Sequence, residues 1–380
     1  MIPLTRLTTM PEGRLRVLIA GGGTGGHVLP ALAVACELVA QYGAEVRFLG
    51  TARGMETRLV PAAGFPLELV PVGQLNRVSW GTRLRTVARL PMGLLACLRL
   101  LRNFRPHAVL GVGGYASGPA MLAAILTGTP RMAFEPNAVP GMANRWVGRW
   151  VQAAAVNFAD TSRFFRNATV TGVPVRPEFF SLPAPGPDAP PHLLVFGGSQ
   201  GARVLNAILP QIAAPLLAGV PGLTILHQCG AGHLQETREA YLRNGAPADR
   251  TNNAANSRWE VREFLDDMPQ RFAAATLVLC RSGASTVAEL AAAAKPSLLV
   301  PFPLAADDHQ RRNAEILVGA GAAAMLLQAD LTPQTLLEQL TALLRDSGRL
   351  AAMGRRARLL AHPDAARQMA RILHHLRQRP

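Results

Sequence analysis

One short pattern occurs twice in this chain, and it constrains the fold more than any other feature. The stretch VLIAGGGTGG occupies residues 17–26, and LLVFGGSQGA occupies residues 193–202. Each begins with four apolar residues, typical of a buried strand, and continues through a glycine turn into a stretch with helical spacing. Strand, turn and helix in this order open a parallel sheet covered by helices on both faces. The chain is therefore predicted to form two α/β domains.

Further apolar runs alternate with helical stretches in both halves. We expect strands at residues 15–20, 45–49, 107–110, 131–134, 153–158, 192–196, 223–227, 276–280 and 297–300. Helices are expected at residues 30–41 and 204–217, and residues 331–378 show helical patterning alone. The Pro-rich segment at 181–191 fits neither a helix nor a sheet interior. It is expected to be the hinge between two doubly wound domains.

The charge of the chain is strongly positive. Lys and Arg together number 39 against 24 Asp and Glu, which gives a net charge of +15. This balance favours an anionic partner, either nucleic acid, a phosphorylated substrate or an acidic membrane. Aromatic residues make up 5% of the chain and no nucleic-acid-binding motif is present, so nucleic acid is not expected.

Cysteine spacing and hydropathy bear on the compartment. Four cysteines are present, and none of them forms a CxxC pair, which argues against a zinc knuckle and a disulfide framework. Glycines interrupt the uncharged stretch at 108–130, so no membrane-spanning segment is expected. The N-terminus has no hydrophobic signal core, and a cytoplasmic protein is therefore expected.

The first glycine loop, GGGTGGH at residues 21–27, has a composition that suits anion binding. Glycines let backbone N–H groups approach a phosphate at a helix N-terminus. The loop also satisfies GxGxxG, but a nicotinamide site needs an acid at the end of the second strand, and that strand reads FLGT there. A glycine turn needed only for packing stays open as an alternative. His27 follows the loop and is expected to face the ligand-binding edge of the sheet.

Two loops of the second half carry polar residues at the same kind of position. RSGASTVAE at 281–289 follows a strand and opens a helix, where backbone N–H groups suit a diphosphate. Glu289 is either a capping-box acid or an acceptor for a ribose diol. In the segment 302–313, His309 and Gln310 can bond sugar hydroxyls, although a polar helix start explains them equally well.

Two further loops lie in the first half, GVGGYAS at 111–117 and EPNAVPG at 135–141. Glu135 ends a predicted strand, so it lies either beside the ligand or in a solvent-exposed turn.

The stretch between Val72 and Arg105 combines seven arginines with many leucines and contains no Asp or Glu. A basic amphipathic surface of this kind suits an anionic membrane interface. An ordinary core helix with a solvated arginine face is the alternative.

Seven strings, in this order, closely resemble one family, the bacterial N-acetylglucosaminyltransferases of peptidoglycan synthesis (glycosyltransferase family 28). They are GGTGGH with PALA at 22–33, GVGGYASGP at 111–119, EPNAVPGMANR at 135–145, GVPVR at 172–176, GGSQGA at 197–202, RSGASTVAE at 281–289 and HQRRNA at 309–314. They extend over roughly 300 residues, which makes the resemblance specific.

The resemblance implies a GT-B fold, in which two Rossmann-like, doubly wound parallel-sheet domains face a central cleft. Residues 1–176 would be the acceptor and membrane-associating domain and 177–361 the UDP-GlcNAc-binding domain. Residues 362–380 would form a helix that crosses back onto the first domain. The implied reaction is the inverting transfer of N-acetylglucosamine from UDP-GlcNAc to the 4-hydroxyl of the muramyl sugar of undecaprenyl-pyrophosphoryl-MurNAc-pentapeptide (lipid I), which makes lipid II.

The resemblance also implies a location and partners. The protein would lie peripherally on the cytoplasmic face of the bacterial inner membrane, with the 72–105 stretch on the membrane. Proteins of cell-wall synthesis or division are candidate partners.

Site residues follow from the same resemblance. Glu289 would meet the ribose, Gln310 the sugar and Leu265 the uracil. Ser199 and the helix start at 284–287 would meet the diphosphate. The whole implied donor set is Thr24, Gly25, Gly26, Asn137, Arg176, Ser199, Leu265, Ala284, Ser285, Thr286, Val287, Ala288, Glu289 and Gln310.

For catalysis, a base must remove the proton of the acceptor hydroxyl. His27 is the first candidate, because an imidazole titrates near pH ~6.5, and Glu135 is the second. No Asp-x-Asp motif is present, so no cofactor and no tightly held metal are expected. The chain departs from the family pattern at Pro136, where Gln is usual, and at Val173, where Asn is usual. Pro136 restricts the backbone of Glu135.

Three rival functions remain open on the sequence. The first is a nicotinamide enzyme built on the GGGTGG loop, and the second is a non-enzymatic basic scaffold on a membrane or nucleic acid. The third is another GT-B UDP-sugar transferase that acts on a glycolipid acceptor.

Overall fold

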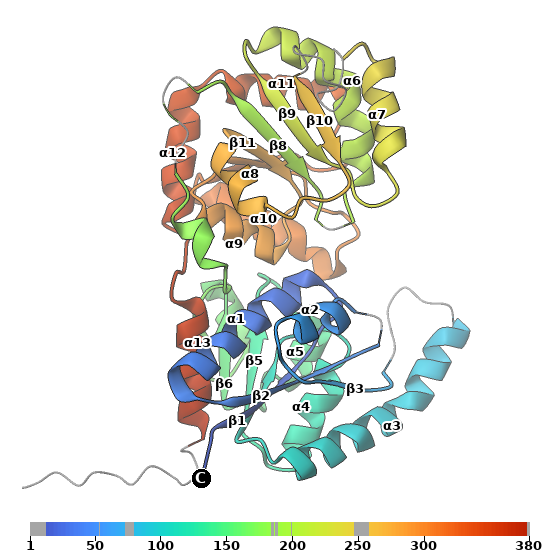
Figure 1. Cartoon of the computed structure of the whole chain (residues 1–380), viewed down its shortest axis with the longest axis vertical. Coiled ribbons are helices and arrows are strands. Elements are labelled where there is room, and N and C mark those ends of the chain that lie inside the picture. The colour runs from blue at the N-terminus through green and yellow to red at the C-terminus, as the bar shows by residue number, and fades with distance from the viewer. Residues whose placement is uncertain are drawn as a thin grey trace, which may run out of the picture.

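The structure consists of two α/β domains, one above the other in Figure 1. It is a computed structural model that describes residues 13–52, 54–72, 80–183, 186, 189–198, 200–246 and 258–377, and of residues 80–90 the backbone alone. All four cysteines are unpaired. None of the described helices is both long and apolar enough to cross a membrane.

The N-terminal domain has a seven-stranded parallel sheet in the order β3-β2-β1-β4-β5-β6-β7. Its strands are β1 (Arg16–Ala20), β2 (Glu45–Gly50), β3 (Leu67–Leu69), β4 (Ala108–Gly111), β5 (Arg131–Glu135), β6 (Ala153–Val156) and β7 (Ala168–Val170). Its helices are α1 (Gly25–Tyr42), α2 (Glu56–Ala62), α3 (Trp80–Phe104), α4 (Ser117–Leu126), α5 (Met142–Val147) and the 3-10 turn η1 (Ala159–Phe164). Apolar clusters cover both faces of this sheet, which is why its central strands are mostly apolar.

The C-terminal domain has a six-stranded parallel sheet in the order β10-β9-β8-β11-β12-β13. Its strands are β8 (His192–Phe196), β9 (Thr224–Gln228), β10 (Trp259–Arg262), β11 (Leu277–Cys280), β12 (Ser297–Leu299) and β13 (Ala323–Met325). Its helices are α6 (Arg203–Gly219), α7 (Leu234–Arg243), α8 (Met268–Ala274), α9 (Ala284–Ala292), α10 (His309–Gly319), α11 (Pro333–Leu344) and α12 (Ser347–Arg358), with 3-10 turns η2 (Pro177–Phe180) and η4 (Ala306–Asp308). In both sheets the strand order reverses direction beside the first strand of the domain, as in doubly wound folds.

The last helix, α13 (Ala365–Leu376), packs on the N-terminal domain beside α1 (Figure 1). Its side chains Met369, Leu373 and Leu376 are fully buried in the same apolar cluster as β1 and β4. The chain thus leaves the N-terminal domain once and returns to it at its end.

The crossing into the C-terminal domain lies before the Pro-rich segment. Val173 belongs to the core of the N-terminal domain, whereas Phe179 and Leu182 already pack in the core of the C-terminal domain. The expectation that residues 181–191 form the hinge is therefore wrong. The chain crosses at 173–175, where the return crossing also passes, because a Cβ on Gly172 would lie 2.3 Å from the ring of His362.

Every predicted strand is present, and each end lies within two residues of its predicted place. The helix predicted at 30–41 begins earlier, at Gly25, because Pro30 is tolerated inside the helix and does not mark its start. Four strands were not predicted, β3, β7, β10 and β13, and three of them have three residues each.

Candidate active site between the two domains

The two glycine loops of the N-terminal domain lie against each other at the ends of β1 and β4. A Cβ on Gly21 would lie 2.4 Å from the carbonyl oxygen of Gly113, and a Cβ on Gly114 would lie 2.4 Å from that of Gly22. Only glycine permits such an approach of two backbones. The loops therefore form one surface at the carboxyl edge of the sheet, where ligands of α/β proteins bind.

His27 lies in the first turn of α1 with its ring against this surface. A Cβ on Gly113 would lie 3.0 Å from its Cε1 atom. Its Nδ1 atom is buried and has no hydrogen-bond partner among the described residues. Burial lowers the pKa of His27 below 6.5, and the charge of Glu135 opposes this change. The imidazole is therefore neutral at pH 7 and can accept a proton.

Glu135, the other candidate base, is occupied by its own loop. Its Oε1 atom accepts hydrogen bonds from the backbone N–H and the side-chain amide of Asn137, at 3.0 and 3.1 Å. Its Oε2 atom accepts from the backbone N–H of Gly141 at 3.0 Å and from the side chain of Asn144 at 2.9 Å. The carboxylate is 2% exposed, so it is not the solvent-exposed turn acid of the sequence alternative. This geometry favours a role in shaping the loop over a role as base.

Three polar contacts join this edge to the C-terminal domain. The hydroxyl of Ser285, in the first turn of α9, donates to the carbonyl oxygen of Gly26 at 3.3 Å. Arg145 and Asp307 form an exposed ion pair of 3.2 Å across the interface. The third contact is made by Asn313 on α10, whose side chain is completely buried.

Asn313 connects both domains through one amide group. Its oxygen accepts from the backbone N–H of Ala138 at 2.9 Å. Its nitrogen donates to the side-chain oxygen of Asn137 at 3.2 Å and to the carbonyl oxygen of Ser282 at 3.1 Å. Because all these bonds are made by one buried amide, Asn313 fixes the 137–138 loop of the N-terminal domain against the loop at Ser282 of the C-terminal domain. The two domains therefore meet at the loops that carry the candidate site residues.

The start of α9 is suited to an anion. Gly283 precedes the helix in an extended conformation, and its cap position has no side chain. Ala284, Ser285 and Thr286 make the first turn, whose N–H groups have no acceptor within the helix. No acidic residue lies in that turn, so the helix dipole is free to act on a diphosphate.

Glu289 lies one turn further along α9 and is half-buried. Burial raises its pKa to about 7, and Arg176 partly offsets this increase. Because the helix starts at Ala284, Glu289 is too far along it to cap the N-terminus, and the capping-box alternative is wrong. No donor among the described residues bonds to this carboxylate, so its oxygens are available to a ligand.

Gln310 lies beside the same helix start. Its side-chain oxygen accepts from the backbone N–H of Phe302 at 3.0 Å, and its carbonyl oxygen accepts from the hydroxyl of Ser282 at 2.8 Å. These bonds leave its amide nitrogen free to donate to a sugar hydroxyl. The nearby Asp307 and Asp308 have φ angles of 52° and 53°, strained for residues with a Cβ.

The remaining residues predicted for the donor site differ in their exposure. Thr24 is exposed at the N-cap of α1, and Gly25 and Gly26 open that helix. Arg176 is exposed and stacks on Phe179 at 5.0 Å. Leu265 is buried in the domain core, so only its backbone can contact the uracil ring.

Two positions on α9 have packing roles. Val287 is buried in the core of the C-terminal domain, whereas Ala288 packs against the core of the N-terminal domain. Ser199 lies outside the described residues.

Two polar residues of this region were not singled out in the sequence. One is Asn313, whose HQRRNA string was noted without a role for the asparagine. The other is Glu56, which is 1% exposed and accepts three hydrogen bonds beside the first glycine loop. The only available signal for Glu56 was an acid between Gly50 and an apolar helix.

No group of three or more His, Cys, Asp or Glu side chains that could hold a metal ion occurs in the part of the chain that the structure describes. The dinucleotide alternative lacks its ribose acid. β2 ends at Gly50, and the nearest carboxylate beyond it, Glu56, is bonded to protein groups.

Two Rossmann-like domains that meet at the carboxyl edges of their parallel sheets define the GT-B fold. The family follows from sequence matches. Residues 17–156 match the glycosyltransferase family 28 N-terminal domain, and residues 192–369 match the family 28 C-terminal domain. The chain belongs to glycosyltransferase family 28.

Curated relatives match almost end to end. The chain is 46% identical over 97% of its length to a Solibacter usitatus protein, of which 98% is covered. It is 42% identical over 94% of its length to a Syntrophotalea carbinolica protein, again with 98% covered. Both are named UDP-N-acetylglucosamine–N-acetylmuramyl-(pentapeptide) pyrophosphoryl-undecaprenol N-acetylglucosamine transferase.

Solved structures agree with the fold. The crystal structure of Acinetobacter baumannii MurG superposes with a TM-score of 0.79 at 33% identity, covering 95% of this chain and 99% of that one. A UDP-GlcNAc 2-epimerase from Neisseria meningitidis shares the fold with a TM-score of 0.65 at 14% identity, covering 95% of this chain and 100% of that one.

Proposed function

We propose that this protein transfers N-acetylglucosamine from UDP-GlcNAc to the 4-hydroxyl of the muramyl sugar of lipid I, with inversion at the anomeric carbon, and so makes lipid II. The observation that carries the proposal is the meeting of the α9 N-terminus and the His27 loop, joined by the bond from Ser285 to Gly26. The names of the curated relatives supply the donor and the acceptor.

In this proposal the C-terminal domain holds the donor. The N–H groups at 284–286 bind the diphosphate and stabilise the charge that develops on departing UDP. The free carboxylate oxygens of Glu289 accept the ribose hydroxyls, and the amide nitrogen of Gln310 donates to the sugar. Arg176, Ser199 and the backbone of Leu265 complete the donor site, with Asn137 and the 24–26 loop approaching from the other domain.

His27 acts as the base. Its neutral imidazole removes the proton of the acceptor hydroxyl as oxygen attacks the anomeric carbon and the bond to UDP breaks. Glu135 holds the loop of Asn137 and does not accept the proton, because four protein donors already occupy its oxygens. No cofactor is proposed, and the helix N-terminus takes the part that a tightly held metal plays elsewhere.

The direct test is a transfer assay with labelled UDP-GlcNAc. We expect label in lipid-linked MurNAc-pentapeptide and none in a diacylglycerol glycolipid, and chelation by EDTA should leave the rate unchanged. Label in the glycolipid alone would support the other GT-B acceptor class and contradict the proposal. Release of UDP without any labelled acceptor would also contradict it.

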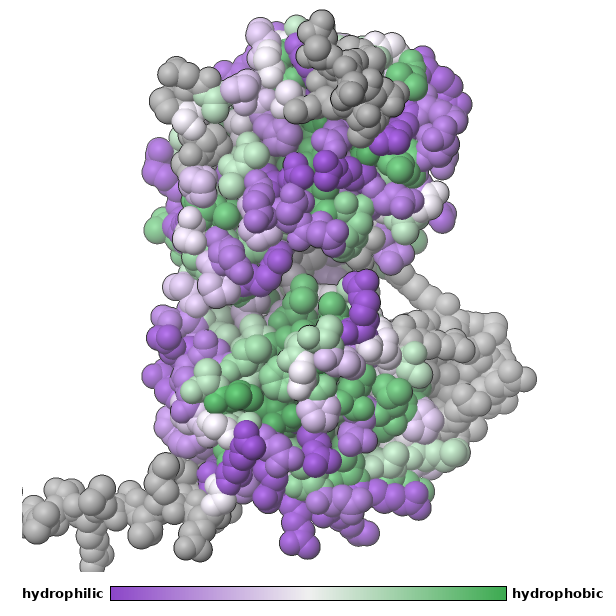
Figure 2. All heavy atoms as spheres, viewed as in Figure 1, coloured by the Kyte–Doolittle hydropathy of each residue, from purple (hydrophilic) through white to green (hydrophobic). Residues whose placement is uncertain are grey.

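The N-terminal domain carries the surface proposed to meet the membrane at the cytoplasmic face. Between Glu68 and Asp160 the chain has ten arginines, of which Arg131 is buried, and a single acid, the buried Glu135. Apolar residues gather on this half of the molecule in Figure 2, whereas the C-terminal half is mostly hydrophilic in that view. A basic and apolar surface of this kind binds an anionic bilayer.

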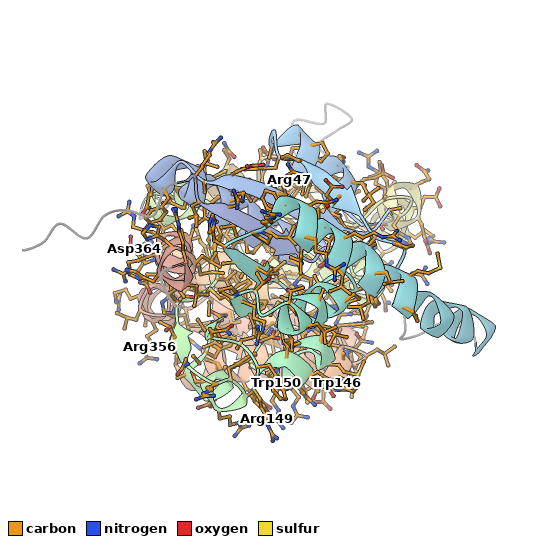
Figure 3. All side chains as sticks on the ribbon, turned by 90° about the horizontal axis from the view of Figure 1, so that it is seen from below. Arg47, Trp146, Arg149, Trp150, Arg356 and Asp364 are labelled. Atoms are coloured by element: carbon orange, nitrogen blue, oxygen red, sulfur yellow. The ribbon has the colours of Figure 1, made fainter. Side chains whose placement is uncertain are left out.

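Several apolar side chains of this domain are unusually exposed, and they lie on α3, α4 and α5 and just beyond α5. Trp146 is 81% exposed and Trp150 61%, and both lie with Arg149 at one edge of the domain in Figure 3. The helices α3 and α4 pack together and carry four more exposed apolar side chains, Met92, Leu95, Leu122 and Leu126. Tryptophan favours the membrane–water interface. The proposed membrane surface thus extends beyond the predicted 72–105 stretch, of which residues 73–79 and the side chains of 80–90 lie outside the described residues.

Replacing Arg99 and Arg149 together by alanine is expected to weaken binding to vesicles that contain phosphatidylglycerol roughly tenfold or more, because each arginine near an anionic surface contributes about 1 kcal/mol. Vesicle sedimentation measures it. The matched control replaces Arg243 and Arg355, two exposed arginines of the C-terminal domain, by alanine. Equal loss in both double variants would show that net charge, and not this surface, governs binding.

A further inference from the structure

A buried carboxylate supports the glycine loop that leads to His27. Glu56 opens α2 and is 1% exposed. Its Oε2 atom accepts the backbone N–H of Gly23 at 2.7 Å. Its Oε1 atom accepts both the backbone N–H and the hydroxyl of Thr51, each at 2.9 Å. Glu56 thereby joins the loop after β1 to the loop after β2.

The space around this carboxylate is formed by glycines from two segments, the loop after β1 and the stretch from the end of β2 to α2. A Cβ on Gly22 would lie 2.3 Å from the Cδ atom of Glu56, and one on Gly50 would lie 2.6 Å from its Cγ. A Cβ on Gly54 would lie 1.9 Å from its Oε2. Side chains at these positions would displace the carboxylate, so the surrounding backbone is shaped to hold it.

Hydrogen bonds fix the loop at both backbone polar groups of Gly23. The N–H of Gly23 donates to Glu56, and its carbonyl oxygen accepts the backbone N–H of Met55 at 3.2 Å. Helix α1 begins two residues later, and His27 lies in its first turn. A change at Glu56 therefore moves the backbone that sets the position of the imidazole.

We infer that Glu56 is a positioning residue of the transfer reaction, which fixes the 21–26 loop and thereby the place of His27 opposite the donor. The inference rests on the proposed function. Glu56 touches no substrate in it, because its oxygens face the protein.

The charge of Glu56 gives the inference a readout that a purely structural residue would lack. The ionisable groups whose charges act on His27 are Glu135, Glu56 and His309. The negative charge of Glu56 favours the protonated imidazole, so it raises the pKa of His27 against the larger effect of burial. Replacing Glu56 by neutral glutamine must therefore lower that pKa.

The test compares Glu56→Gln with wild type and with Glu68→Gln, a control on an exposed carboxylate of β3. We expect kcat to fall at least about tenfold in Glu56→Gln, since a small misplacement of a reacting group is costly. UDP-GlcNAc affinity, measured by calorimetry, should not change. The titration of the His27 imidazole, followed by NMR without substrate, should move to lower pH in Glu56→Gln.

Two results would overturn the inference. One is a Glu56→Gln variant that matches Glu68→Gln in kcat, and the other is a loss of kcat while the His27 titration stays in place. If Glu56→Gln does not fold, Thr51→Val decides, because it removes one of the three donors. Thr51→Val must change both kcat and the titration of His27 from their wild-type values. If either quantity keeps its wild-type value, the inference is contradicted. A wild-type protein that transfers no sugar would instead contradict the proposed function, while the NMR titration would still test Glu56.

Discussion

Replacing His27 by alanine is expected to lower kcat by about 10²–10⁴-fold, the usual contribution of a general base. The affinity for UDP-GlcNAc should be nearly unchanged, because most proposed donor contacts belong to the other domain. Steady-state kinetics with calorimetry separates the two quantities. His233→Ala, a substitution on the C-terminal domain outside the proposed site, is the matched control.

The pH dependence identifies the base independently. Burial lowers the pKa of His27, so the acid limb of the kcat/KM profile should have its midpoint below pH ~6.5. The rate falls on that limb because protonated imidazole cannot accept a proton. A full acid limb that persists in His27→Ala, with kcat intact, would remove His27 from the mechanism and return Glu135 to consideration.

Replacing Glu289 by alanine is expected to weaken UDP-GlcNAc binding at least about 100-fold. Each hydrogen bond to a charged group contributes about 1.5–3 kcal/mol, and a ribose diol makes two. Calorimetry with a 2′,3′-dideoxy donor provides the matched comparison. Wild type should lose as much affinity for that donor as Glu289→Ala loses for the normal one. The variant itself should bind both donors equally, and a preference of the variant for the normal donor would place Glu289 elsewhere.

The raised pKa of Glu289 predicts a cost in stability. Its pKa of about 7 in the folded protein lies above the ordinary 4.5. The protonated carboxyl is therefore favoured by folding, and the stability that it contributes is fully present below pH 4.5 and is lost as the pH rises through 7. Glu289→Gln should therefore melt at a higher temperature than wild type at pH 8 and at the same temperature at pH 4. Donor binding by wild type should strengthen from pH 6 to pH 8, because the ionised carboxylate is the better acceptor.

The architecture could be predicted because local signals and the fold agree. Apolar runs such as 192–196 form buried parallel strands, and glycine loops such as 21–26 follow them where the backbones must approach closely. Edge strands such as β3 have three residues, too few to show a periodicity. The hinge was misplaced because proline content marks an irregular segment without showing which core it packs against.

The site was harder to predict than the fold because its contacts join distant parts of the chain. The bond from the backbone N–H of Ala138 to the side-chain oxygen of Asn313 links residues 175 positions apart, and no local pattern encodes it. Glu56 looks in the sequence like an ordinary first-turn acid of a short helix, and its role depends on its bond to Gly23 in a loop 33 positions earlier in the chain. Glu135 was recognised by its place at a strand end, but its four donors become visible only when the loop is folded.

The most direct measurement is the crystal structure of the protein with UDP-GlcNAc. The diphosphate should lie within about 3 Å of the N–H groups at 284–286, the ribose against Glu289, and the anomeric carbon on the side of His27. A nucleotide bound along Gly21–Gly26 with its ribose near Thr51, or a sugar directed away from His27, would contradict the assignment of donor and base to opposite domains.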